Sequence, residues 1–325
     1  MSSFSAIYLR MPNWIGDLCM TLPCLETLLE TGKPVIVCAR PWAEELLAAY
    51  PLHGFIPLSG QLRQDRKAVK SYRQQQNNNT VYGLLLPDSF SSAAIFRLAG
   101  IPCAGHIDDG RRLLLRWPFK KSSTPCHAVE AWYRLTTLSL QAWNLPLATN
   151  ARPPKELALR LNSKHHHIAQ QLMADHHLQP GNYILIAPTA VGRHHGKNKV
   201  WNGFDALTRA LQSRGHTVVM CPPPAERDQA QANAPSAHCL PAVSLGGFAA
   251  LAKSSQLVVC NDSGVSHIAA AVGAKQLTLF GVTNRNRTGP WSPQAHCLGS
   301  DAGWPTVEEV LTKIQTLIPE SSAWR

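Results

Sequence analysis

The sequence lacks the features that mark several classes of protein. Its 325 residues hold no Cys-x-x-Cys pair, no Gly-x-Gly-x-x-Gly motif after any predicted strand, and no internal repeat of 20 to 50 residues. No apolar run reaches the roughly 18 residues that a membrane-spanning helix needs. The missing glycine motif disfavours a dehydrogenase, and the absence of a long apolar run argues against an integral membrane protein.

Acidic residues are also scarce. Lys and Arg number 31 against 20 Asp and Glu, which gives a net charge of +11 and a pI near 9.4. Such a balance favours an anionic partner, which composition leaves open as nucleic acid, an acidic membrane face or a phosphorylated substrate. The N-terminus lacks the layout of a secretory signal, so we expect a cytoplasmic protein.

The nine cysteines are irregularly spaced, and three of them lie inside apolar strands: Cys38, Cys221 and Cys260. We expect buried, reduced thiols rather than disulfides. Histidines occur in runs at 165–167, 176–177 and 194–195. Consecutive helical residues point in different directions and no carboxylate set accompanies them, so we expect no metal site.

Short apolar runs alternate with amphipathic stretches along the whole chain, which is typical of repeated β-α units on a parallel sheet. Strands are expected at 6–10, 34–38, 55–58, 81–86, 101–106, 183–187, 216–221, 256–260 and 276–280. Helices are expected at 17–30, 42–50, 61–76, 91–99, 128–143, 163–176, 201–214, 225–232, 247–254, 264–272 and 307–317.

A proline-containing polar stretch at 145–156 is the best linker candidate. It predicts two domains, residues 1–150 and residues 151–325, because the chain exceeds the size of a usual single core. The simplest architecture is two doubly wound α/β domains that face each other across a cleft.

The most informative segment is 256–267, where an apolar strand breaks at Asn261 and restarts as a helix. The start of a helix leaves backbone N–H groups unpaired, and Gly264 allows an anion to approach them closely. Ser263 and His267 lie four residues apart on one side of the helix. Asp262 is interpreted as a helix N-cap or as an acceptor for sugar hydroxyls, because a carboxylate repels phosphate.

Three further segments follow predicted strands, where α/β proteins build their sites. Asp17, next to Gly16, is either a helix N-cap or a general base that takes a proton from a sugar hydroxyl. In the basic loop 188–201, Thr189 offers a hydroxyl and Lys199 a positive charge for a diphosphate. Glu226 follows the strand 216–221 and suits a ribose diol, although glutamate is also common at helix starts.

The helix expected at 61–76 carries basic residues at steps of three and four, which places most of them on one face. They are Arg63, Arg66, Lys67, Lys70 and Arg73. A second basic cluster follows: Arg111, Arg112, Arg116, Lys120 and Lys121. Each residue alone could belong to a solvated face, but together they suit an acceptor that bears carboxylates and phosphates, or an anionic membrane surface.

With these motifs in order, the chain resembles the ADP-heptose:lipopolysaccharide heptosyltransferase family, which is glycosyltransferase family 9 with the GT-B fold. The matching segments are Gly16-Asp17, Lys199-Val200-Trp201, Glu226, and the run from Asp262 to His267. Asn202, the prolines at 222–224 and the length of the loop at 193–197 depart from the family pattern, which makes Lys197 a rival to Lys199.

The resemblance implies an inverting, metal-independent enzyme without a cofactor, with Asp17 as the catalytic base. It moves heptose from ADP-L-glycero-D-manno-heptose to the inner core of lipopolysaccharide, of the Kdo-lipid A type. The implied donor-binding residues are Thr189, Lys199, Glu226, Asp262, Ser263, Gly264 and His267. The expected acceptor-binding residues are Arg63, Arg66, Lys67 and Lys70 in the first domain.

We expect the protein to contact the inner face of the cytoplasmic membrane peripherally, and the terminal helix to pack back on the first domain. Two alternatives remain at this point: a GT-B enzyme with another nucleotide-sugar or acceptor, or a protein that binds nucleotide or nucleic acid without chemistry. The second is less favoured, because no recognition helix or basic strand interleaved with aromatic residues is visible, and so we expect no nucleic-acid partner.

Overall fold

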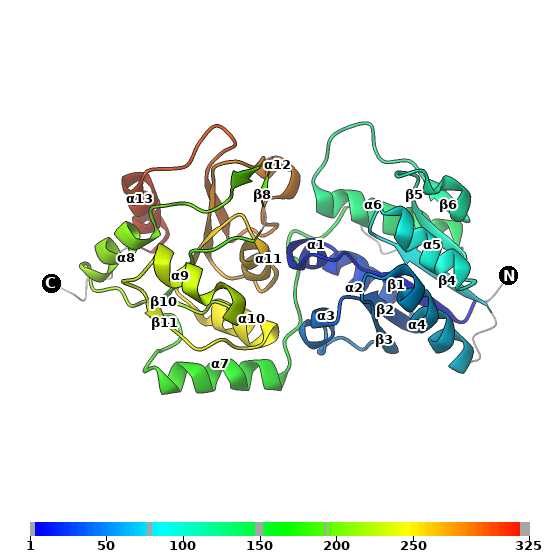
Figure 1. Ribbon diagram of the computed structural model, residues 1–325, viewed down its shortest axis with the longest axis horizontal. Coiled ribbons are helices and arrows are strands. Elements are labelled where there is room, and N and C mark those ends of the chain that lie inside the picture. The colour runs from blue at the N-terminus through cyan, green and yellow to red at the C-terminus, as the bar shows by residue number, and fades with distance from the viewer. Residues whose placement is uncertain (1–3, 77–79, 147–151, 192, 195, 319–325) are drawn as a thin grey trace. The chain divides into compact units, whose positions relative to one another are not determined.

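The structure is a computed structural model that describes all residues except 1–3, 77–79, 147–151, 192, 195 and 319–325. The chain divides into two compact units, Met1–Pro154 and Lys155–Arg325 (Figure 1). Each unit is built on one six-stranded sheet, and the second unit adds a two-stranded hairpin. Residues 147–151 of the predicted linker at 145–156 lie outside the described residues, and the boundary between the two units falls within this linker.

The first unit is a parallel sheet with strand order β3-β2-β1-β4-β5-β6. Its strands are β1 (Ala6–Arg10), β2 (Val35–Ala39), β3 (Gly54–Pro57), β4 (Val81–Leu85), β5 (Cys103–His106) and β6 (Trp117–Phe119). Every residue of β1 and β2 is buried, as expected for central strands with helices on both faces.

The helices of this unit connect successive strands. They are α1 (Ile15–Met20), α2 (Leu22–Glu30), α3 (Trp42–Leu46), α4 (Leu62–Gln75), α5 (Phe90–Leu98), the 3₁₀ helix η1 (Arg111–Leu114) and α6 (Ala128–Ala142). The single helix expected at 17–30 is wrong, because the chain breaks at Thr21 into α1 and α2. Pro23 explains the break, since it has no N–H to donate to the preceding turn.

The second unit repeats the same order as β11-β10-β7-β12-β13-β14, again with parallel neighbours. Its strands are β7 (Ile184–Ala187), β10 (Val218–Met220), β11 (His238–Cys239), β12 (Leu257–Asn261), β13 (Gln276–Phe280) and β14 (Ala295–Gly299). The hairpin consists of β8 (Arg193–His194) and β9 (Lys197–Asn198). In both units the order reverses beside the first strand, which is where Rossmann-like folds bind ligands.

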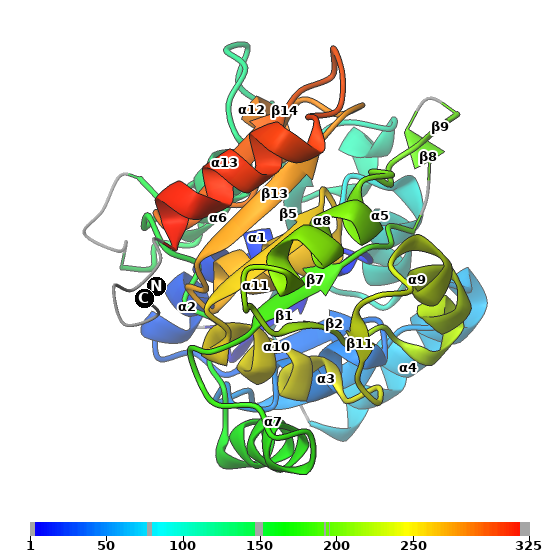
Figure 2. The same cartoon turned by 90° about the vertical axis from the view of Figure 1, so that its left-hand side faces the viewer.

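The helices of the second unit are α7 (Ser163–Asp175), α8 (Phe204–Gln212), η2 (Pro224–Glu226), α9 (Arg227–Asn233), α10 (Leu245–Ser254), α11 (Gly264–Ala271), α12 (Arg285–Thr288) and α13 (Val307–Leu317). The terminal helix α13 lies beside α8 (Figure 2). Its Val310 and Ile314 belong to the core of this unit. The expected contact of this helix with the first domain stays a prediction.

The elements absent from the predicted set are mainly edge strands. β6, β11 and β14 each lie at the edge of a sheet and are short or contain proline, histidine or glycine. An edge strand pairs on one side only, so its sequence needs less apolar patterning than a central strand. Among the described helices, none is both long enough and apolar enough to span a bilayer.

Candidate functional site

In the second unit, Asn261 holds both ends of the segment that connects β7 to α8. It is the last residue of β12, is fully buried, and its Oδ1 accepts a hydrogen bond from the backbone N–H of Trp201 at 2.9 Å. Its Nδ2 donates to the carbonyls of Ala187 and Thr189 at 3.4 and 3.3 Å. A buried amide that satisfies three backbone groups fixes the loop after β7 against the start of the next helix.

Thr189 and Glu226, two predicted donor-binding residues, are in contact. The Thr189 hydroxyl donates a hydrogen bond to Oε2 of Glu226. Thr189 follows β7 and is buried, while Glu226 ends η2 after the neighbouring strand β10. The sheet order therefore brings together a hydroxyl and a carboxylate that are 37 residues apart.

Lys199 and Asp262, two more predicted residues, form an ion pair. Nζ of Lys199 lies 3.4 Å from Oδ2 of Asp262. The same oxygen accepts a hydrogen bond from the hydroxyl of Thr283 at 2.7 Å, and Thr283 follows β13. The side chain of Lys197, the rival to Lys199, lies outside the described part of the structure.

The helix α11 begins where the anion site is predicted. Its N-cap is Ser263, whose Oγ accepts from the N–H of Val265 at 3.3 Å, so the interpretation of Asp262 as the N-cap is wrong. Gly264 is the first helical residue, and His267 lies one turn further on and is almost entirely buried. This end of the helix offers backbone N–H groups beside the Lys199 ammonium, a combination that can hold phosphate oxygens.

Asn261 and Thr283 are not among the predicted site residues, although each lies at or just after the carboxyl end of a strand. A polar residue at the end of a predicted strand is the feature of the sequence that could have identified both as site residues. Their roles depend on partners in other segments, the loop after β7 for Asn261 and the side chain of Asp262 for Thr283. Only the strand order reveals these partners.

In the first unit, Asp17 lies in the first turn of α1, directly after the central strand β1. The N-cap of this helix is Trp14, so the alternative interpretation of Asp17 as the N-cap is wrong. The Asp17 side chain is partly exposed, and a carboxylate is favoured in a first turn by the helix dipole. Its position permits contact with a solvent-borne substrate, as a general base requires.

The loop that leads to Asp17 is held by Arg10, the last residue of β1. This arginine is 5% exposed, donates from Nη1 to the carbonyl of Met11, and donates from Nη2 to Oδ1 of Asn13 at 2.6 Å. Burial lowers the pKa of Arg10 to about 10, and it remains a cation at neutral pH. A buried cation with two local acceptors restricts the path of the chain from β1 to α1.

The basic residues predicted to bind acceptor lie on α4. Arg63, Arg66, Lys67 and Lys70 have exposed side chains. Arg73 instead donates to the carbonyls of Ala99 and Gly100 at the end of α5. The helix begins beside a loop fixed by buried Asp65, which accepts from the N–H and hydroxyl of Ser59 and from the N–H of Gly60.

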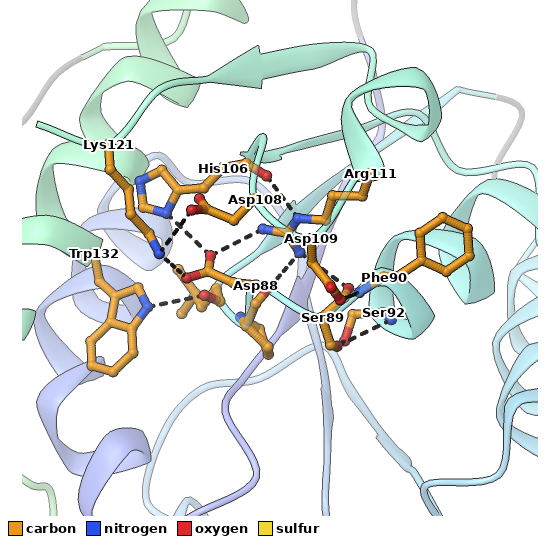
Figure 3. Close-up of polar contacts among 12 residues, drawn as sticks. Asp88, Ser89, Phe90, Ser92, His106, Asp108, Asp109, Arg111, Lys121 and Trp132 are labelled. Carbon is orange, nitrogen blue, oxygen red and sulfur yellow. Dashed lines mark hydrogen bonds and ion pairs between the residues drawn. The ribbon is translucent and has the colours of Figure 1, made fainter.

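The second basic cluster is not a uniform surface. Arg111 is fully buried, and its Nε donates to the His106 carbonyl at 2.7 Å while Nη2 lies 3.1 Å from Asp88 (Figure 3). Lys121 lies 2.5 Å from Asp88 and 3.4 Å from Asp108. Arg111 is therefore not available to a ligand, and the prediction that this cluster suits an anionic acceptor is wrong for this residue.

Asp88, His106 and Asp108 together have the residue types of a metal site, with ligand atoms within 4.8 Å of one another. The ammonium of Lys121 and the guanidinium of Arg111 already supply positive charge to these carboxylates. Burial raises the pKa of Asp88, but hydrogen bonds from His106 and Lys121 outweigh it and lower the pKa to about 2. These carboxylates are therefore interpreted as members of a partly exposed ion network rather than as a cation site.

The nine cysteines are thiols rather than disulfides. All nine are free, and Cys38, Cys221 and Cys260 are buried as predicted, whereas Cys126 is exposed. Burial raises the pKa of Cys19, two residues after Asp17, to about 12. A thiol with such a pKa is protonated at neutral pH and is a poor nucleophile.

Two doubly wound parallel sheets, each covered by helices, define an α/β protein with two Rossmann-like units. Residues 69–315 match the model of glycosyltransferase family 9 (heptosyltransferase). This match covers more than half of the chain, and the chain belongs to that family.

Known relatives agree with this assignment. Lipopolysaccharide heptosyltransferase 3 of Escherichia coli is 36% identical over 121 residues, which is 34% of this chain and 34% of that protein. The chain thus spans about a third of the length of this curated relative.

Solved structures show the fold. The structure of E. coli ADP-heptose lps heptosyltransferase II has a TM-score of 0.75 at 22% identity, covering 96% of this chain and 98% of that one. The E. coli heptosyltransferase WaaC with ADP has a TM-score of 0.72 at 19% identity, covering 96% and 99%. The predicted GT-B fold, with two Rossmann-like units, is confirmed.

Proposed function

We propose that this protein is an inverting, metal-independent glycosyltransferase that moves heptose from ADP-L-glycero-D-manno-heptose to the inner core of lipopolysaccharide. The observation that carries the proposal is the family match over residues 69–315. The ADP in the similar WaaC structure supports the choice of nucleotide. Asp17 lies outside the matched residues, so its proposed role rests on its position after β1 and its partial exposure.

The chemistry begins with the carboxylate of Asp17, which takes the proton of an acceptor hydroxyl. The acceptor oxygen then forms a bond to the anomeric carbon on the face opposite ADP, and the bond from that carbon to the diphosphate breaks. The electron pair leaves with ADP. Attack from the opposite face inverts the configuration at the anomeric carbon.

The second unit would hold the donor. The N–H groups at the start of α11 and the ammonium of Lys199 suit the diphosphate, and their charge stabilises ADP as it departs. The carboxylate of Glu226, which accepts from Thr189, suits the ribose diol. Asp262 fixes Lys199 before the donor binds, which limits the reorganisation needed during the reaction.

The first unit would hold the acceptor. The exposed cations of α4 suit the carboxylates and phosphates of a Kdo-lipid A type inner core. Because the acceptor is a lipid, we propose that the protein works in the cytoplasm at the inner face of the membrane, in peripheral contact with it. A nucleic-acid partner is not part of this proposal.

The first test uses purified protein, ADP-heptose and a heptose-free inner-core acceptor, with ADP release as the readout. We predict that Asp17→Asn lowers the rate by about 100-fold or more, since a positioned general base contributes at least that factor. ADP binding, measured by calorimetry, stays within about threefold of the wild type because Asp17 does not hold the donor.

The matched control is Glu44→Gln, which also removes a carboxylate from the first turn of a helix in the same unit. We expect it to leave the rate unchanged. If Asp17→Asn releases ADP as fast as the wild type, Asp17 is not the catalytic base. If the wild type transfers no heptose, the proposed activity is refuted.

A further inference from the structure

Half of the large apolar side chains that are exposed in the described chain lie on two adjoining elements, α5 and η1. Leu113 in η1 is 92% exposed, and Phe90 and Leu98 at the two ends of α5 are 48% and 53% exposed. Six large hydrophobic side chains are exposed among the described residues, and these are three of them. A single exposed leucine is ordinary, but a gathering on two adjoining elements indicates a contact surface.

The two elements are fixed to each other, so the exposure does not come from a loose loop. The backbone N–H of Phe90 donates to Oδ2 of Asp109 at 2.7 Å, just before η1. Buried Arg111, inside η1, donates to the carbonyls of Pro87 and Ser89 at 2.5 and 3.4 Å. Figure 3 shows Asp109 bonded to the backbone of Phe90, and Arg111 beside the segment that leads into α5.

Positive charge surrounds these apolar side chains. Neither α5 nor η1 contains an acidic residue. Three arginines with exposed side chains lie in or just after these elements: Arg97 in α5, Arg112 in η1, and Arg116. Phe90, Arg97 and Leu98 are spaced i, i+7 and i+8, which places them on one face of α5. The basic helix α4 packs beside α5 and extends the positive surface.

Acidic groups near this surface are already engaged by other residues. Asp88 and Asp108 face the ammonium of Lys121, and Asp109 accepts from a backbone N–H. Asp109 is exposed and keeps its charge, but the three exposed arginines outnumber it, so the layer presents a net positive charge outward. We call the six exposed residues Phe90, Leu98, Leu113, Arg97, Arg112 and Arg116 the α5/η1 face.

We propose that the α5/η1 face docks on an anionic lipid bilayer. Its three apolar side chains would enter the interfacial region while the arginines contact the negative headgroups. Single-stranded nucleic acid would use aromatic side chains for stacking on bases, and two of the three apolar residues here are leucines. The inference deepens the proposed function, on which it rests, because it names the surface that would bring the enzyme to a lipid-borne acceptor.

The test measures binding of the full chain to vesicles by co-sedimentation, without donor or acceptor. Vesicles contain either phosphatidylcholine alone or phosphatidylcholine mixed with phosphatidylglycerol. The wild type is expected to bind only the mixed vesicles well. Leu113→Ser should lower the partition coefficient by about tenfold, the effect of withdrawing one leucine side chain from an apolar environment. Arg112→Gln should lower it by about fivefold, since each basic residue near the surface contributes that order of binding.

Two control variants in the second unit change the same residue types on other surfaces. Val191→Ser removes an apolar side chain that is 69% exposed, and Arg214→Gln removes an exposed arginine. Both should bind mixed vesicles as the wild type does. Circular dichroism melting of every variant checks that the fold is kept. Leu113→Glu, which repels the anionic surface, should bind more weakly than Leu113→Ser.

Several outcomes would overturn the proposal. These are equal binding of the wild type to both kinds of vesicle, an equal loss for Val191→Ser and Leu113→Ser, and a wild-type dimer that Leu113→Ser dissociates. Tight nucleic-acid binding that Leu113→Ser abolishes would overturn it as well. Heptose transfer to a water-soluble inner-core acceptor separates the two proposals: Leu113→Ser should retain it, whereas a wild type without transfer refutes only the enzymatic function.

Discussion

Arg111 and Arg112 are neighbours in sequence and have opposite environments. Arg111 is fully buried and donates to His106, Pro87 and Asp88, while Arg112 is exposed. An arginine is normally found at the surface unless it is paired, so nothing in the pattern of the chain marks the first as internal. The residues that pair with it come from the ends of β4 and β5, which are neighbours only in the folded sheet.

The ion network around Asp88 makes stability depend on pH in the acid range. Its pKa falls from an ordinary value of 3.8 to about 2 in the folded protein, despite burial, because His106 and Lys121 donate to it. A folded-state pKa below the unfolded one stabilises the protein above about pH 4, and this contribution is lost as the pH falls toward 2. Because the side chain is 35% exposed, solvent screening limits the contribution to about 1 to 2 kcal/mol.

We therefore predict that Asp88→Asn lowers the free energy of unfolding at pH 6 and that the difference from the wild type shrinks toward pH 2. Urea unfolding at several pH values measures it. The exposed Asp175→Asn serves as the control, with no expected change. A deficit of Asp88→Asn that stays constant down to pH 2 would show that the carboxylate is not stabilised by these partners.

At the scale of elements, the start of α11 has a structural and a proposed functional role that mutation can separate. Ser263 caps this helix through the N–H of Val265, and Ser244 caps α10 in the same way through the N–H of Gly247 at 3.2 Å. Ser263→Ala and Ser244→Ala should each cost about 1 kcal/mol of stability through loss of the cap.

Only Ser263→Ala should also weaken ADP binding, by about tenfold, because a hydroxyl that contacts a charged phosphate contributes about 1.5 kcal/mol. Urea unfolding and calorimetric titration with ADP measure the two effects. Equal affinity of both variants for ADP would indicate that the nucleotide does not bind at α11.

The sequence predicts the central strands of both sheets, but it does not predict most of the edge strands. The strands β1 and β13 have the predicted bounds because continuous apolar runs, as expected for strands buried on both faces, mark them clearly. β6 and β14 form through pairing with β5 and β13, and this contact between separate segments is not revealed by a three-residue run with proline or by a run that mixes histidine and glycine with apolar residues.

The candidate site shows the same division at the level of side chains. Predicted residues such as Asp262 stand at strand ends, where local sequence indicates a site. The order of the strands in the sheet decides which side chains come into contact. The contacts of Asp262 with Lys199 and Thr283 are therefore known only from the structure.

At the scale of the whole molecule, the two units have separate cores. The core of the second unit runs from Ile184 to Ile318, and the core of the first unit from Ala6 to Leu115. Each six-stranded sheet is completed within one unit, and no strand of either sheet comes from the other. A unit that buries its own apolar face and closes its own hydrogen bonds can fold alone.

We predict that residues 155–325 expressed alone unfold cooperatively and bind ADP within about tenfold of the affinity of the full chain, since the proposed donor contacts all lie in this unit. Thermal unfolding and calorimetry provide the measurements, and residues 1–154 serve as the control that should fold without binding ADP. The isolated second unit should release no ADP from ADP-heptose and acceptor, because Asp17 is absent from it. If that unit folds but binds no ADP while the full chain does, the donor site requires residues of the first unit, and its assignment to the loops after β7, β10 and β12 is incomplete.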